Sequence, residues 1–73
     1  MKDVENFLLK NGFEKIHRKI PSYKNNKCTI MIVMDKFYSI RYIKGKVYSD
    51  DLNIYWLIGF LTYNGLMDKN YIQ

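Results

Sequence analysis

The segment from Leu52 to Tyr63 is apolar on nearly every side of a helical wheel, and this constrains the fold most. One side carries Ile54, Leu57, Ile58 and Leu61; the opposite side carries Leu52, Tyr55, Trp56, Gly59 and Tyr63, with Phe60 between them. A surface helix needs a single apolar stripe a little over 100° wide. A chain of 73 residues offers one sheet and one other helix to cover the second side. Either these cover the helix completely in a cleft, or its second side contacts another molecule.

The rest of the chain predicts a second helix and three strands. A stripe of Val4, Phe7 and Leu8 favours a helix over residues 3–11, with Gly12 as its left-handed C-terminal residue. Period-two alternation predicts strands over 13–20, 27–34 and 37–43, a polar loop over 22–26 and a turn at 35–36. Residues 47–48 either continue the third strand or form a short further one.

The last helix is expected to begin at Ser49-Asp50-Asp51, which can cap the free amides, and to run to about Asn64, with Gly65 after it. A polar tail follows from Asp68. The predicted order is α-β-β-β-α, an α+β fold in which a three-stranded antiparallel sheet packs against N- and C-terminal helices, all within one domain over residues 1–73.

The chemistry-bearing residues do not form a recognisable catalytic or metal site. Cys28 is the only cysteine and His17 the only histidine, so neither a disulfide nor a zinc site is expected, and Cys28 is interpreted as a buried residue. The adjacent Asp50 and Asp51 are explained by capping, and the glycines form no phosphate-binding loop. We therefore expect no enzyme, no cofactor, no metal and no small-molecule substrate. No signal peptide or membrane-spanning run is apparent, which predicts a cytoplasmic protein.

Positive charge is concentrated in the middle of the chain, whose net charge is +5. Ten of the twelve Lys and Arg residues lie between Lys10 and Lys46, opposed there by Glu14 and Asp35 alone. The candidate anion-binding or nucleic-acid-binding residues are Arg18, Lys19, Lys24, Lys27, Arg41, Lys44 and Lys46. Tyr38 and Tyr42 could stack bases beside them, or could pack in the core. The cations mark an anionic partner or solvate the outer face and edges of a sheet.

The aromatic side of the last helix is the candidate protein-binding site, formed by Tyr55, Trp56, Gly59 and Tyr63. Tyr and Trp are enriched at the centres of interfaces, and Gly59 would let another backbone approach closely. The partner would be a different protein or a second copy of the chain in a homodimer.

Residues 48–66, YSDDLNIYWLIGFLTYNGL, together with the Lys, Asn, Ile and Tyr bias of the chain, resemble small accessory proteins of AT-rich phages and mobile elements. The resemblance implies an inhibitor or modulator of a host defence complex, of the anti-CRISPR type. It covers no defined motif and assigns no residue a role. Because the chain is basic, mimicry of DNA is disfavoured. A basic inhibitor could instead occupy a protein groove, or an acidic or guide-RNA-exposed surface.

Overall fold

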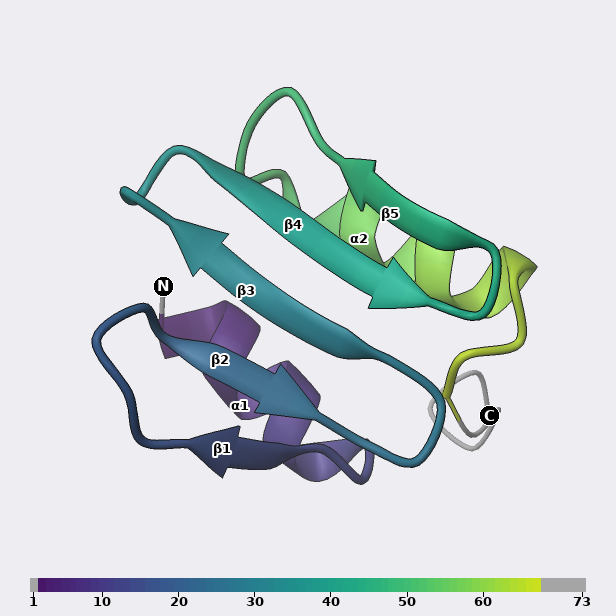
Figure 1. Ribbon diagram of the computed structural model, residues 1–73, viewed down its shortest axis with the longest axis horizontal. Coiled ribbons are helices and arrows are strands. Elements are labelled where there is room, and N and C mark those ends of the chain that lie inside the picture. The colour runs from purple at the N-terminus through teal and green to yellow at the C-terminus, as the bar shows by residue number, and fades with distance from the viewer. Residues whose placement is uncertain (1, 68–73) are drawn as a thin grey trace.

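Five antiparallel strands form one sheet, and both helices lie on the same side of it (Figure 1). The computed structural model describes residues 2–67, so the expected polar tail from Asp68 lies outside the described residues. The elements in chain order are α1 (Lys2–Lys10), β1 (Glu14–Ile16), β2 (Ser22–Lys24), β3 (Thr29–Val33), β4 (Phe37–Tyr42), β5 (Gly45–Tyr48) and α2 (Ile54–Tyr63). Each strand pairs with the next strand along the chain. The α+β class and the antiparallel sheet are confirmed.

The prediction of three strands is wrong, because β2 and β5 were missed or left undecided. β2 has three residues and occupies the segment expected to be a polar loop, yet Ser22 and Tyr23 are buried in it. β5 has four residues and begins at Gly45. Strands this short carry no local alternation pattern, and their backbone is fixed by pairing with β3 and β4.

The two helices end in the same way. The Phe13 amide donates to the Leu8 carbonyl at 3.0 Å, and the Leu66 amide donates to the Leu61 carbonyl at 2.9 Å. The residue before each of these donors is a glycine: Gly12, with φ of 89°, precedes Phe13, and Gly65, with φ of 65°, precedes Leu66. Both ends are therefore Schellman motifs, in which the left-handed residue satisfies the last carbonyls. The predicted C-terminal glycines are confirmed, and segments 7–13 and 60–66 share the pattern Phe-Leu-x-x-Asn-Gly-apolar.

The predicted start of the last helix is wrong by about one turn. Asn53 is the N-cap, and its side-chain oxygen accepts from the amides of Tyr55 and Trp56. Ser49 instead holds the preceding loop against β4: its hydroxyl accepts from the Tyr38 amide at 2.8 Å and donates to the Asp51 carbonyl at 2.6 Å. Ser49, Asp50, Asp51 and Asn53 are all residue types that can cap a helix. Because Ser49 is bound to β4, the helix begins after Asn53 instead.

The β3–β4 turn is also displaced by one residue from the expected position. Met34 and Asp35 have φ of 52° and 55°, and the Lys36 amide donates to the Val33 carbonyl at 2.9 Å. Positive φ at both central residues is characteristic of a type I′ turn, whose twist matches that of a hairpin.

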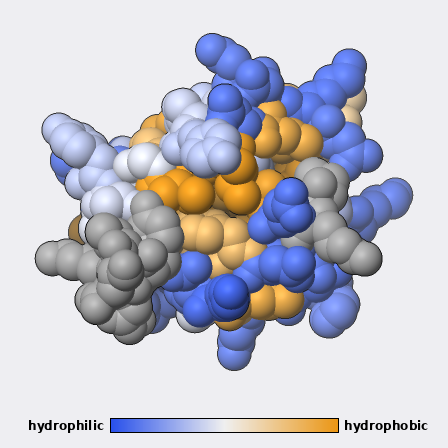
Figure 2. All heavy atoms as spheres, turned by 180° about the vertical axis from the view of Figure 1, so that it is seen from behind, coloured by the Kyte–Doolittle hydropathy of each residue, from blue (hydrophilic) through white to orange (hydrophobic). Residues whose placement is uncertain are grey.

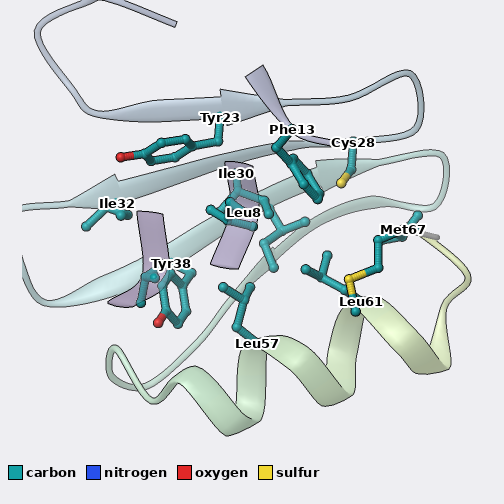
Figure 3. Close-up of a cluster of buried hydrophobic side chains, with 13 residues drawn as sticks. Leu8, Phe13, Tyr23, Cys28, Ile30, Ile32, Tyr38, Leu57, Leu61 and Met67 are labelled. Carbon is teal, nitrogen blue, oxygen red and sulfur yellow. The ribbon is translucent and has the colours of Figure 1, made fainter. Parts of the chain in front are cut away.

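The core lies between the sheet and the two helices (Figure 3). Leu8 of α1 and Leu57 and Leu61 of α2 are fully buried against side chains of the sheet. The cross-strand pairs Tyr23–Ile30, Ile30–Ile40 and Ile32–Tyr38 supply the sheet side of this core. Cys28 is buried as expected. Because the core occupies only one face of the sheet, the opposite face is available for other contacts.

Candidate interaction surfaces

The first candidate surface is the α2 outer face, which we define as Tyr55, Gly59, Thr62 and Tyr63. These residues recur at helical spacing, so they lie on one side of α2. Tyr55 is 80% exposed and Tyr63 is 90% exposed. On the opposite side Leu57 and Leu61 are buried. The arrangement leaves two large aromatic side chains in solvent on a helix that is held firmly by its other side.

Trp56 is not part of the α2 outer face, although it was grouped with Tyr55 in the sequence. Its ring stacks on Tyr38 with centroids 6.2 Å apart and on Phe60 with centroids 5.2 Å apart. Phe60 in turn meets Tyr42 edge to face at 5.4 Å. Trp56 is half-buried in this row of four rings and therefore fixes α2 on β4.

The segment that carries the α2 outer face has no charged residue. No acidic or basic residue occurs between positions 52 and 67, although charged residues make up 26% of the chain. Seen from the helix side, an apolar band crosses the molecule and hydrophilic side chains border it (Figure 2). Depletion of charge combined with exposed Tyr is the composition found at the centres of protein interfaces.

The second candidate surface is the open face, the side of the sheet that faces away from both helices. Strand pairing places its residues in cross-strand rows, since paired residues point to the same side. The first row is Glu14, Lys24, Thr29, Arg41 and Lys46; the second is Ile16, Ser22, Met31, Ser39 and Tyr48; the third is Val33 and Phe37. Charged and aromatic residues thus share one surface that no element within residues 2–67 covers.

The middle of the open face is aromatic and apolar. Tyr48 is 59% exposed, and Phe37 meets its ring edge to face with centroids 5.9 Å apart. Ile16 and Met31 are half-buried, while Ser22 and Ser39 lie buried between their larger row neighbours. An exposed sheet face is usually polar, so this mixture of apolar and cationic side chains is itself informative.

The candidate cations of the sequence divide between several places. Lys24, Arg41 and Lys46 come together in the first row of the open face, and all three are exposed. The others lie in connections: Arg18 and Lys19 between β1 and β2, Lys27 between β2 and β3, and Lys44 between β4 and β5. The Lys27 ammonium donates to the Gly65 carbonyl at 3.3 Å, so this residue helps to hold the end of α2.

Tyr38 and Tyr42, the tyrosines considered for base stacking, lie on the helix side. Tyr38 is fully buried and donates its hydroxyl to the Leu52 carbonyl at 2.8 Å. The rings of the open face are the half-buried Phe37 and the exposed Tyr48, which sequence reasoning did not select. Period-two alternation places Phe37 on the same face as Arg41, and this pattern could have indicated that the two side chains share the open face.

The titratable groups with shifted pKa values have structural causes. Burial is the main cause that raises the pKa of the Cys28 thiol to about 11 and that of Tyr23 to about 12. The Tyr23 hydroxyl donates to Glu5 at 2.6 Å, and Lys15 donates to the same oxygen at 3.1 Å. The hydrogen bond from Tyr23 is the largest contribution to the lowered pKa of Glu5. This network ties α1 to β1 and β2.

Sites for chemistry are not evident in the part of the chain that the structure describes. Within residues 2–67 no three His, Cys, Asp or Glu side chains cluster as metal ligands would. An open hollow of about 410 Å³ is lined by Gly12, Glu14, Lys24, Asn25 and Asn26. Over the same residues, no helix reaches the length and hydrophobicity of a membrane span.

The α2 outer face and the open face of the sheet are therefore the two candidate functional sites. Comparisons with models of protein families, with curated proteins and with solved structures found no match to this chain.

Proposed function

We propose that this chain is a non-enzymatic binding module that docks onto another protein through the α2 outer face. Its resemblance to phage and mobile-element accessory proteins suggests the setting, in which it inhibits or modulates a host defence complex. The observation that carries the proposal is the pair Tyr55 and Tyr63, 80% and 90% exposed on a charge-free helix. Such rings lose little conformational entropy on binding and gain apolar contact area.

The framework beneath this face is suited to binding. Leu57 and Leu61 anchor α2 in the core, Trp56 stacks between two rings, and Asn53 caps its first turn. A surface held in place before binding avoids the entropic cost of ordering it. Gly59 lies between the two tyrosines. Among the described residues, an added Cβ there would meet no atom within 4 Å apart from those of its own helix backbone and chain neighbours, so the gap is open to a partner's side chain or backbone.

The partner expected here is apolar or aromatic at its contact, and not a polyanion. Residues 52–67 offer no cation to a phosphate or a carboxylate. A second copy of the chain would satisfy the same chemistry, as a two-fold contact pairs a surface with itself. Light scattering on the purified protein distinguishes self-association from a different partner.

The test is a tagged pull-down from the native host, treated with nuclease, with the wild type and the double variant Tyr55→Ala/Tyr63→Ala. We expect a specific protein to be captured by the wild type and lost by the variant, while thermal melts stay alike because both side chains are exposed. Tyr48→Ala is the matched control, since it removes an exposed tyrosine from the open face. Capture that survives the double variant, or that fails equally with the control, contradicts the assignment.

A further inference from the structure

We propose that the open face of the sheet is a second binding site, which takes single-stranded nucleic acid with its phosphates along the cationic row and a base on Tyr48. This goes beyond the docking role of α2, because it concerns the opposite side of the molecule and a different class of partner.

The cations of the row are close together and are not neutralised. Arg41 and Lys46 are cross-strand partners, and Lys24 lies on β2, two strands from Arg41. At about 4.8 Å between strands, Lys24 and Lys46 are about 14 Å apart along the row. Within residues 2–67 the only ion pair is Lys15–Glu5, on the helix side. Three cations therefore face solvent in a line, with Glu14 as the single acid at its outer end.

An aromatic platform adjoins this line. Tyr48 follows Lys46 by two residues on β5, so the two side chains emerge on the same face, about 7 Å apart along the strand. One nucleotide can bridge that distance between its phosphate and its base. The edge-to-face contact with Phe37 restricts the Tyr48 ring, and a restricted ring loses less entropy when a base stacks on it.

The geometry favours an unpaired strand over a duplex. Bases stack on aromatic side chains only when they are splayed out, whereas in a duplex they are hidden between base pairs. Within residues 2–67 no helix projects from the open face to enter a major groove, as α1 and α2 both lie on the other side (Figure 1). An acidic protein surface would engage the cations but would have no need of the Tyr48 platform.

Fluorescence anisotropy with labelled single-stranded DNA and RNA of about 12 nucleotides, compared with duplex DNA and a poly-glutamate peptide, provides the test. Three phosphate contacts predict a slope of log affinity against log salt of about −2, at roughly −0.7 per contact. DNA and RNA arms show which sugar is preferred, and binding of either supports the site. Failure to bind both at low salt, or stronger binding of duplex or peptide, overturns it.

Variants on each side of the molecule locate the binding. Arg41→Ala and Lys46→Ala should each reduce the steepness of the salt slope by about 0.7. Tyr48→Ala should weaken binding about 5- to 150-fold, the range for the loss of one stacked base. Lys10→Ala and Tyr63→Ala, which remove an exposed cation and an exposed tyrosine on the helix side, should leave affinity unchanged. Equal losses in the helix-side controls, in proteins with unaltered melts, would refute the assignment to the open face.

Discussion

Replacing Trp56 by alanine tests whether α2 is oriented as described, with its tryptophan inward and Tyr55 outward. A Trp side chain offers about 150–250 Å², and more than half of Trp56 is covered. Covering about 100 Å² contributes about 2.5 kcal/mol at 25 cal/mol/Å², which is an upper estimate because a real unfolded chain already buries part of its apolar surface. The stacked contacts with Tyr38 and Phe60 add about 1 kcal/mol each. The higher helix propensity of alanine offsets a few tenths of a kcal/mol of this loss.

The expected loss is therefore about 4 kcal/mol. Marginal stability of about 0.05–0.15 kcal/mol per residue gives a folded chain of 73 residues an unfolding free energy of about 4–11 kcal/mol, so Trp56→Ala should remove a large share of it. Trp56→Phe keeps a ring in the stack and should cost roughly 1 kcal/mol. Tyr55→Ala, one position earlier and 80% exposed, should change stability by less than about 0.5 kcal/mol.

Urea unfolding followed by far-UV circular dichroism measures these differences in unfolding free energy. Circular dichroism replaces tryptophan fluorescence because Trp56 is the only tryptophan and its loss removes the fluorescence signal. With a slope near 1 kcal/mol per molar urea, Trp56→Ala should lower the midpoint by about 4 M. A loss below about 1 kcal/mol, or an equal loss in Tyr55→Ala, would show that the helix is rotated. Trp56 would then belong to the surface, and the separation of anchor and docking face would fail.

Three further outcomes follow from single contacts. Cys28, with its pKa raised to about 11 by burial, should resist thiol reagents at pH 8 until urea unfolds the chain, as followed by mass spectrometry. Asn25→Ala should cost about 1–2 kcal/mol in thermal melts, because the Asn25 amide donates to the Leu66 carbonyl at 2.7 Å. Because the pKa of Glu5 is lowered in the folded chain, the contribution of Glu5 to folding stability is present above about pH 4.3. This contribution is lost as the pH falls through the folded-state pKa. The stability gap between wild type and Glu5→Gln should therefore close in acid.

Sequence reasoning recovered the elements whose signals are local. Gly12 and Gly65 mark the helix ends because a left-handed residue is needed there. Alternation along Phe37–Tyr42 separated Tyr38 and Ile40 from Arg41 correctly, since the period of a strand depends only on backbone geometry. The strands β2 and β5 escaped because their backbone is fixed by pairing with distant residues, which no short window contains.

The surfaces were harder to foresee for the same reason. That Tyr55 is exposed and Trp56 half-buried depends on how α2 is rotated against β4, a matter of a few tens of degrees that a wheel of wholly apolar residues does not determine. The row of cations required the strand register: Arg41 and Lys24 are far apart in the chain and come together only through β3. Charge could be counted from the sequence, but its placement opposite the helices could not.

The segregation of charge makes the two proposed sites separable by salt alone. Docking through the α2 outer face involves no charged residue within positions 52–67, so its affinity should be nearly flat between low and moderate salt, or should rise slightly as apolar burial strengthens. Binding on the open face releases counterions from the nucleic acid and should fall steeply over the same range. If a protein partner captured through Tyr55 and Tyr63 dissociates in moderate salt, then charge dominates that contact, and the apolar docking assigned to α2 is wrong.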